Sequence, residues 1–330
     1  MKQYLTPKWL LSSFALIVFL FWLLSVYWSF EPELFEPKLL AQQQASQSNE
    51  SVVAGYTITT SLIKVAETLL NKSGGYLSND VLPPSVMMDN IPSWEFGALE
   101  MTRDLALAMR QDFSRSQSQS LENPFLTKAQ PQLNIDSLNW ILPSSESAYQ
   151  DAIDNLYQYR SSLADGGQQQ GQFYARADNL RSWLKQIEKR LGSFSQRLSA
   201  SVGQERIDTS LAGDAQASQS TPTASRLTDK ASWWELDDNF YEARGASWAL
   251  IHFLKAVEVD FADVLAKKNA TVSLQQIIRE LEATQESLWS PMILNGSGFG
   301  TLANHSLVMA NYISRANAAL IELSELLNQG

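Results

Sequence analysis

The sequence predicts an all-α protein in which a single N-terminal transmembrane helix is followed by a helical bundle. Residues 9–30 form an uncharged apolar run, WLLSSFALIVFLFWLLSVYWSF. Beyond residue 50, apolar residues recur every three or four positions in several segments, which is the period of an amphipathic helix. No segment shows, over a useful length, the alternation of apolar and polar residues that is typical of β-strands.

The apolar run is long enough to cross a membrane, because a bilayer core about 30 Å thick needs roughly 20 apolar residues in a helix. It extends from Trp9 to Phe30, and aromatic side chains near both ends suit the two membrane interfaces. A cleaved signal peptide would have a shorter apolar region, and the first small-x-small site, near Ala41, lies beyond two Glu-Pro pairs. We therefore predict an uncleaved anchor, which makes the lipid bilayer the first expected partner.

Charges on the two sides of the anchor predict its orientation. Lys2 and Lys8 precede the run, whereas Glu31, Glu33 and Glu36 follow it. Positively charged flanks stay in the cytoplasm. Residues 1–8 are therefore expected to be a short cytoplasmic N-terminus, and residues 31–330 are expected on the outer side of the membrane.

Overall composition excludes several classes of protein. The chain has 25 basic and 35 acidic residues and a net charge of −10, which argues against nucleic-acid binding. Without Lys2 and Lys8 the balance is 23 to 35, or −12, which also disfavours adhesion to anionic lipid headgroups. Because cysteine is absent, disulfides, zinc-thiolate sites, iron–sulfur clusters and thiol catalysis are excluded.

Composition divides the chain beyond the anchor into four segments. Residues 31–50 are expected to be a tether, since prolines stiffen their start and the remainder is rich in Gln and Ser. Residues 51–202 are expected to form one helical region. Residues 203–230, rich in Ser, Thr, Ala and Gln, predict a flexible linker. Residues 231–330 are expected to form a C-terminal helical region that packs with residues 51–202.

Apolar spacing and helix-breaking residues predict the helices inside these regions. Residues 74–96 contain Pro83, Pro84 and Pro92, so no helix is expected to continue through them, and Ser93 is expected to cap the next helix. The apolar content of this stretch nevertheless predicts packing against neighbouring helices. Helices are expected at about 55–73, 93–113, 147–165, 173–200, 231–268, 273–288 and 302–327.

The chain carries two patterns that resemble catalytic motifs. Residues 296–300 give G-x-G-x-G before a helix, but the dinucleotide motif requires a preceding strand and the P-loop requires Gly-Lys-Ser/Thr. A tight helix–helix connection is the favoured interpretation. Ser61 and Lys64 fit S-x-x-K of serine acyl-enzymes, but a K-T-G-like element follows only eight residues later, which is the wrong arrangement. We predict no catalytic residues.

A ligand site remains a candidate around one of the two histidines. His252 lies in an apolar context and is interpreted as a satisfied core residue or a helix-face neighbour. His305 could line a site with Asn295, Ser297 and Asn304. No H-E-x-x-H or E-x-x-H pattern accompanies the histidines, and the acidic cluster at residues 258–263 is interpreted as a solvated helix face. No metal and no cofactor is predicted.

Several longer strings are distinctive together. They are GGYLSNDVLPP (74–84), DFSRSQSQS (112–120), FYARADNLRSWL (173–184), ELEATQESLWSPMILNGSGFG (280–300) and LANHSLVMANYISRANAA (302–319). They resemble a family of proteobacterial proteins catalogued as domain of unknown function 2333, and the resemblance covers nearly the whole chain after the tether. It implies a single-pass inner-membrane protein of Gram-negative bacteria and implies no activity.

Three functions are compatible with these observations. The favoured hypothesis is a non-enzymatic envelope scaffold that interacts with another envelope protein, and it predicts an exposed apolar patch. The alternative is a ligand-binding or hydrolytic module acting on cell-wall or lipid material around residues 295–305, which predicts a deep pocket. A transmembrane receptor would have to signal through a partner subunit, because about eight residues are expected inside.

Overall fold

The structure, a computed structural model, describes residues 7–116, 120–165, 171–207, 226–229, 231–288, 290, 292–297 and 300–329. Its α-helices are α1 (Pro7–Trp28), α2 (Pro37–Ser48), α3 (Tyr56–Asn71), α4 (Asn90–Ala108), α5 (Pro124–Leu133), α6 (Ser145–Ala164), α7 (Ala177–Ser199), α8 (Leu236–Asp260), α9 (Ala262–Lys267), α10 (Thr271–Ala283) and α11 (His305–Asn328). Short helical turns are η1 (Ser85–Met87), η2 (Met109–Phe113, a π-turn), η3 (Ala200–Val202) and η4 (Trp233–Glu235). The predicted all-α fold, an N-terminal apolar helix followed by a helical domain, is confirmed.

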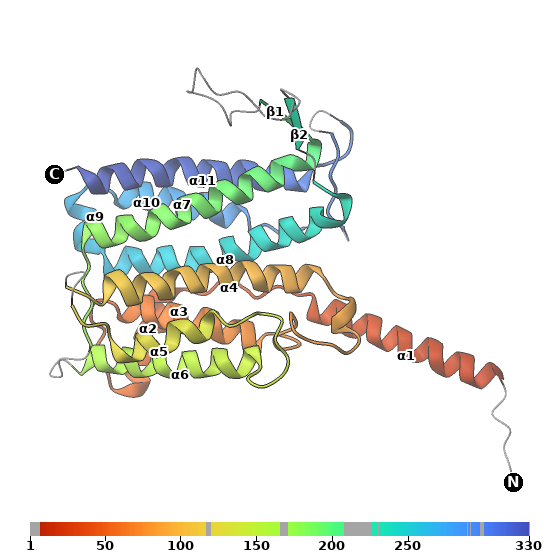
Figure 1. Cartoon of the computed structure of the whole chain (residues 1–330), viewed down its shortest axis with the longest axis horizontal. Coiled ribbons are helices and arrows are strands. Elements are labelled where there is room, and N and C mark those ends of the chain that lie inside the picture. The colour runs from red at the N-terminus through yellow and green to blue at the C-terminus, as the bar shows by residue number, and fades with distance from the viewer. Residues whose placement is uncertain are drawn as a thin grey trace, which may run out of the picture.

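Helix α1 projects away from a body formed by the other helices, which lie roughly side by side (Figure 1). In that body α8 lies in the middle, α7, α10 and α11 lie on one side, and α2, α3, α5 and α6 lie on the other. One continuous core contains side chains from helices before residue 202 and after residue 231. The body therefore behaves as one packed unit around α4 and α8.

Helices α4 and α8 cross with their backbones in direct contact. A Cβ atom added at Gly97 would lie 1.9 Å from the carbonyl oxygen of Glu242, and one added at Gly245 would lie 1.9 Å from that of Trp94. Both distances are far below van der Waals contact, so the crossing requires glycine at these positions. The Trp94 and Trp248 rings meet beside it, with centroids 5.0 Å apart.

The predicted tether at residues 31–50 was wrong. Residues 37–48 form α2, which begins with Pro37 at its first turn and packs on α3 and α8. Ala41 and Ala45, one helical turn apart, are buried in this contact. The segment looks like a linker because its buried side chains are small, but small residues allow close helix packing. Only the neighbouring helices supply the partner that stabilises α2.

Helix boundaries also differ from those expected. Helix α4 begins at Asn90, capped by Asp89, and includes Pro92 in its first turn, where no intrahelical N–H donor is needed. The helix expected at 231–268 is divided at Phe261 into α8 and α9. The Phe261 ring is fully buried against Phe113 and Phe173, so core packing accompanies the break.

The ends of the predicted linker form a short antiparallel strand pair. Strand β1 (Gln204–Ile207) pairs with β2 (Arg226–Asp229), with Gln204 opposite Asp229 and Ile207 opposite Arg226. Residues 208–225 lie outside the described residues, so the flexible linker stays a prediction there. The strand pair lies at one edge of the body, beyond the ends of α7 and α8 (Figure 1).

Candidate functional site

The four predicted ligand-binding residues lie around the N-terminus of α11. Asn304 is the N-cap residue, and its Oδ1 accepts from the backbone N–H of Leu307 at 2.8 Å. Asn295 forms an isolated antiparallel bridge with Asn304. Ser297 is exposed in the connecting loop. The structure thus brings Asn295, Asn304 and His305 together and leaves Ser297 outside the group.

The polar atoms of this group hold the loop onto the helix. Asn304 Nδ2 donates to the carbonyl oxygen of Gly296 at 2.6 Å, and Ser306 Oγ donates to Asn295 Oδ1 at 2.6 Å. His305 Nδ1 accepts from the backbone N–H of Leu294 at 3.1 Å. These contacts build a helix junction, and they use the side-chain atoms that a ligand would have to reach. The ligand-binding role of the four residues stays a prediction.

His305 also lines a small cleft beside the junction. The cleft has a volume of about 100 Å³, and its other walls include Phe240, Leu288, Met309 and Tyr312. Ligand pockets for drug-sized molecules usually have volumes of about 300–1,000 Å³. Because Nδ1 is an acceptor, the neutral imidazole carries its proton on Nε2. The cleft is thus an apolar site, smaller than a usual ligand pocket, with one imidazole in its wall.

Arg244 forms the floor of this cleft and connects it to the segment that follows α1. Its guanidinium, nearly inaccessible to solvent, donates to the carbonyl oxygens of Thr284 (2.7 Å), Gln285 (3.2 Å) and Glu286 (3.0 Å). Its Nε lies 2.7 Å and 2.8 Å from the carboxylate oxygens of Glu31. One residue of α8 therefore ties the end of α10 to the chain emerging from α1. A lone arginine among the small residues ARGASWA (243–249) was the sequence signal that could have revealed it.

The segment from Trp28 to Glu36, which we name the junction segment, is attached to the body at further points. The Trp28 side chain lies against Gly74, where an added Cβ would be 2.8 Å from its Cγ. Lys255 Nζ lies 3.6 Å from the carboxylate of Glu36 and 2.8 Å from that of Glu282. Together with Arg244, these contacts leave no free tether between α1 and the body.

His252 holds the middle of the junction segment. Its Nε2 accepts from the backbone N–H of Phe35 at 3.0 Å, and its Nδ1 lies 2.7 Å from the carbonyl oxygen of Trp248. Since a carbonyl can only accept, Nδ1 carries the proton and the ring is neutral. Burial lowers the pKa of His252 to about 3. The interpretation as a satisfied core histidine is confirmed, because the side chain is inaccessible to solvent.

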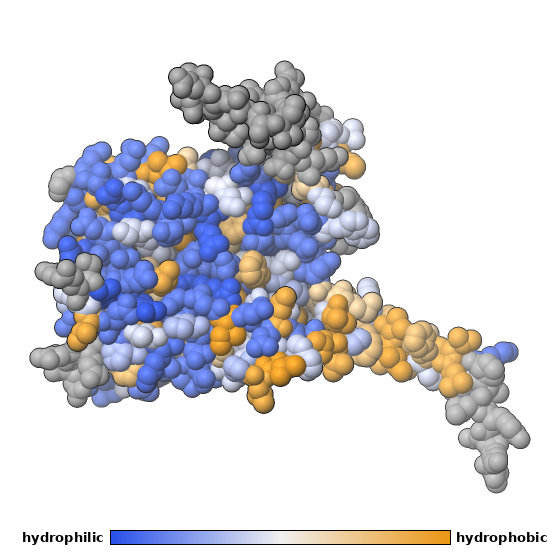
Figure 2. Space-filling model, viewed as in Figure 1, coloured by the Kyte–Doolittle hydropathy of each residue, from blue (hydrophilic) through white to orange (hydrophobic). Residues whose placement is uncertain are grey.

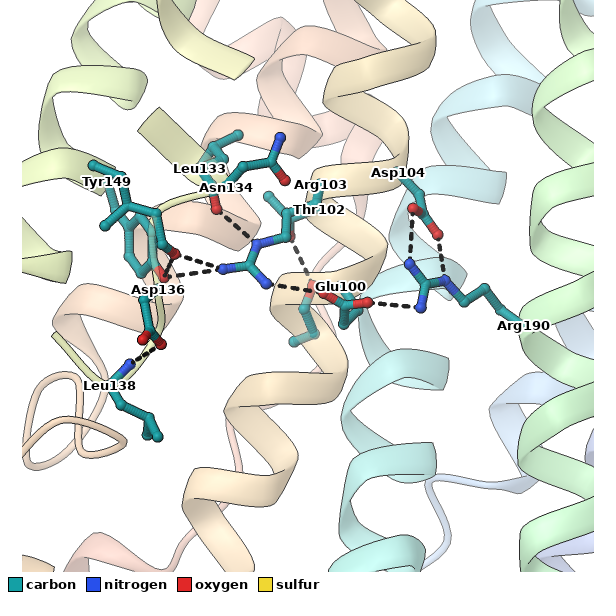
Figure 3. Close-up of polar contacts among 12 residues, drawn as sticks. Glu100, Thr102, Arg103, Asp104, Leu133, Asn134, Asp136, Leu138, Tyr149 and Arg190 are labelled. Carbon is teal, nitrogen blue, oxygen red and sulfur yellow. Dashed lines mark hydrogen bonds and ion pairs between the residues drawn. The ribbon is translucent and has the colours of Figure 1, made fainter. Parts of the chain in front are cut away.

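A second polar network lies on α4 (Figure 3). Glu100 pairs with Arg103 at 2.9 Å and with Arg190 of α7 at 2.7 Å, and Arg190 also pairs with Asp104 at 2.8 Å. Arg103 donates to the carbonyl oxygens of Leu133 (2.7 Å) and of residue 135 (2.8 Å). The network joins α4 to α7 and fixes the loop that follows α5.

The acidic cluster after residue 257 is not simply a solvated face. Asp260 Oδ2 accepts from the backbone N–H of Ile58 at 2.8 Å and so caps the N-terminus of α3. Burial raises the pKa of Asp260 to about 7, although the backbone donors of α3 act in the opposite direction. Among the described residues, no group of three His, Asp or Glu side chains is arranged to hold a metal ion.

Comparison with known proteins gives one match. Residues 3–330 match the model of a family described as uncharacterized protein conserved in bacteria (DUF2333). Neither the curated proteins nor the solved structures contain a match to this chain.

Proposed function

Because the chain belongs to the DUF2333 family, whose description names bacteria and no activity, we propose a function from the junction segment and its contacts. We infer that this is a single-pass inner-membrane protein with a periplasmic helical domain, which acts as a non-enzymatic scaffold for another envelope protein. The observation that carries the proposal is the direct attachment of α1 to the core through Glu31 and Phe35. A scaffold needs a fixed position above the membrane, and this attachment supplies it.

The exposure of α1 supports a membrane span. Among the described helices, α1 is the one long and apolar enough to cross a membrane, over Lys8–Trp28, and none of that window is buried against the body. A core helix of similar composition would be covered by protein. An exposed apolar helix of this length, with its one charge at Lys8 near its end, is stable when lipid covers it.

The packing of α2 supports an anchor that is not cleaved. The first small-x-small sequence after the apolar run, Ser46-Gln47-Ser48, forms the end of α2. Ala41 is fully buried in α2, in contact with the body. Cleavage at the Ser46–Ser48 site would separate α2 from the body, where it packs on α3 and α8.

The charge pattern supports the orientation. Lys2 and Lys8 precede the span and the nearest following charges are Glu31 and Glu33. The positive side of a span stays in the cytoplasm. The body therefore lies in the periplasm.

Cysteine chemistry tests the topology, since the chain has no cysteine. A single cysteine at Val272→Cys, an exposed position on α10, should react with a membrane-impermeant maleimide in intact spheroplasts. The matched control, Lys2→Cys, should react only after the membrane is permeabilised. The reverse pattern would overturn the orientation, and equal reaction of both would overturn the span.

In-cell crosslinking followed by mass spectrometry tests the scaffold. The full chain should crosslink to envelope proteins, and its membrane partners should be lost when residues 9–30 are replaced by a cleavable signal peptide. A matched variant carries a flexible Gly/Ser insertion between Ser29 and Phe30, which keeps the anchor. This insertion variant should no longer crosslink to those partners that bind only when the body is held at a fixed distance from the membrane. A chain that crosslinks to no protein would contradict the proposal.

The cleft at His305 favours a second candidate, a ligand-binding role for residues 295–305. The specific observation is an imidazole in a largely apolar cleft between α8 and α11, whose lining also includes Arg244 and Glu286. Short-chain fatty acids offer the matching chemistry, an apolar chain with a hydrogen-bond acceptor for Nε2. Calorimetric titration of the full chain in detergent with hexanoate tests it, with His305→Phe as the control. Binding that His305→Phe abolishes supports this role, and an absence of binding removes it.

A further inference from the structure

Two loops carry an unusual density of exposed, uncharged apolar side chains. They are residues 81–87 (VLPPSVM), between α3 and α4, and residues 138–142 (LNWIL), between α5 and α6. Neither contains a charged residue. The exposed large apolar side chains in them are Val81, Leu82, Val86, Met87, Leu138, Trp140, Ile141 and Leu142. We name these eight side chains the loop patch.

The two loops are joined to each other. Asn79 Nδ2 donates to the carbonyl oxygen of Asn139 at 2.9 Å and to the carboxylate of Glu146 at 2.8 Å. Asn79 is itself nearly inaccessible to solvent, so this bridge is part of the body. The loop patch is therefore one surface drawn from two parts of the chain.

Each loop is also held in shape. In the first, Ser85 Oγ donates to the carbonyl oxygen of Leu82 at 2.7 Å. In the second, the backbone N–H of Leu138 donates to Asp136 Oδ1 at 3.0 Å, beside the Arg103 contacts (Figure 3). Asn139 Nδ2 donates to the carbonyl oxygen of Pro143 at 2.8 Å. The apolar side chains are thus displayed by loops whose shape is held by side-chain hydrogen bonds.

The loop patch is continuous with the end of α1. The side chain of Trp28, the last residue of α1, lies against Gly74, seven residues before the first loop. Buried Glu95 fixes this stretch, accepting from the backbone N–H groups of Leu77 (2.9 Å) and Ser78 (2.8 Å). Figure 2 shows that the apolar surface of α1 continues onto the adjacent end of the body.

We propose that the loop patch enters the interface of the same bilayer that α1 spans, so that the body has a second, peripheral membrane contact. The proposal rests on the membrane span of the proposed function. Apolar loops with a tryptophan suit the boundary between headgroups and acyl chains. Asp80, Asp89 and Asp136 flank the loops, so the contact is apolar and needs no anionic lipid.

Two attachments have a geometric consequence. A single span allows the body to tilt and rotate about the end of α1. A second contact through the loop patch fixes its orientation, so that the same face of the body always points away from the membrane.

Single-cysteine labelling of the otherwise cysteine-free full chain tests the proposal. Met87→Cys and Leu142→Cys replace side chains that are 82% and 92% exposed, so neither substitution disturbs the core. Each variant is labelled with an environment-sensitive fluorophore and reconstituted in phosphatidylcholine vesicles. Lipids with a quencher near the headgroup should reduce the fluorescence at both positions, and iodide in the water should have little effect.

Two controls separate the possible failures. Val272 is the second residue of α10, and its side chain is 76% exposed. The start of α10 follows α9 at the end of the body opposite α1 (Figure 1). The fluorescence of labelled Val272→Cys should therefore be quenched by iodide alone. Phe19→Cys, in the middle of α1, should be quenched by lipids that carry the quencher deep in the acyl chain. Loss of the Phe19→Cys response overturns the membrane span itself.

The outcome at the loop patch is then decisive. If Phe19→Cys responds to lipid but Met87→Cys and Leu142→Cys behave like Val272→Cys, the loop patch lies in water and the inference alone is overturned. Protection of both loop positions from lipid and from iodide would indicate a protein contact, such as a second copy of the chain, and would also overturn it. Circular dichroism of each labelled variant checks that the helices are retained.

Discussion

The Phe35 ring lies parallel to the His252 imidazole, with ring centroids 3.8 Å apart and an interplanar angle of 12°. The backbone N–H of Phe35 also donates to Nε2 at 3.0 Å. Phe35 follows the last residue of α1 by only seven positions, whereas His252 lies inside α8. This pair therefore fixes the chain leaving α1 onto the central helix of the body.

Acid should destabilise the protein through His252. Its pKa is about 3 in the folded protein and 6.5 in an unfolded chain, so the unfolded state binds more protons between these values. The contribution to stability is present above pH 6.5 and falls by about 1.4 kcal/mol per pH unit below it. Between pH 8 and pH 5 the loss should be about 2 kcal/mol. Denaturant unfolding in detergent measures it when the full chain is compared at each pH with a variant that lacks His252.

The His252→Gln variant isolates this contribution. Asp260 acts with the opposite sign. Its pKa is raised from 3.8 to about 7 in the folded protein, so the folded state binds more protons than the unfolded state between these values. The free energy of unfolding therefore increases through Asp260 as the pH falls from 7 toward 3.8. Between pH 8 and pH 5 the Asp260 gain of about 3 kcal/mol exceeds the His252 loss in the unmodified protein, so the two contributions must be separated. The difference in unfolding free energy between the unmodified protein and His252→Gln should still shrink by about 2 kcal/mol from pH 8 to pH 5. If this difference in unfolding free energy did not change with pH, the His252 imidazole would not be held neutral in the folded protein.

Replacing Arg244 should loosen the junction segment. Arg244→Met leaves the carbonyl oxygens of residues 284–286 and the Glu31 carboxylate without their donor. Breaking a buried pair from one side usually costs about 3–5 kcal/mol. Limited proteolysis within residues 29–36, together with denaturant unfolding, measures the effect. The control is Arg181→Met on α7, whose partner Asn328 is at the surface, and its cost should stay within about 0.5 kcal/mol. Equal effects of the two substitutions would argue against the junction.

Alanine at the α4–α8 crossing should destabilise the body. Gly97→Ala or Gly245→Ala places a Cβ within 1.9 Å of a backbone oxygen of the facing helix, so the helices must separate. Overpacking of this kind costs about 3 kcal/mol. Gly192→Ala on α7 is the matched control, since its nearest atom would be 3.7 Å away. It should stabilise the helix by up to about 1 kcal/mol. Thermal unfolding gives the melting temperatures of the three variants. Equal melting temperatures would contradict the close contact of α4 and α8 at these glycines.

Removing Lys72 should leave a buried charge. Its Nζ lies 2.5 Å from the Glu95 carboxylate, and both side chains are almost entirely inaccessible to solvent. Lys72→Met should therefore cost about 3–5 kcal/mol. Adding Glu95→Gln should recover part of this, since an amide oxygen still accepts from Leu77 and Ser78 without carrying a charge. A double-mutant cycle, measured by denaturant unfolding, gives the coupling free energy between Lys72 and Glu95. A coupling free energy near zero would contradict a buried ion pair.

The spacing of apolar residues was sufficient to predict the helices that have an apolar face. The stripe of α7, with Leu180, Trp183, Leu184, Ile187 and Leu191, is buried as its spacing indicates. The α2 helix shows the opposite case. Its buried positions include two alanines, and alanine carries too little apolar surface to mark a helix face in a Gln- and Ser-rich context. Its packing depends on α3 and α8, which the local sequence does not describe.

The candidate site shows the same division. The spacing of Asn304 before the α11 pattern was visible in the sequence, and the residues around it do gather at the helix start. Arg244 was missed, because its carbonyl partners lie about 40 residues away and its carboxylate partner 213 residues away. Hydrogen bonds between residues so far apart produce no periodic pattern in the sequence.

By itself, the sequence determined the apolar helix at the N-terminus, the helical class and the family, because length, hydropathy and period are local properties of the chain. Tertiary structure decided that residues 31–48 belong to the body, that Phe35 meets His252 across 217 positions, and that Asn79 joins two distant loops with exposed apolar side chains. Those outcomes depend on which helices pack together, and that choice is made by the whole core.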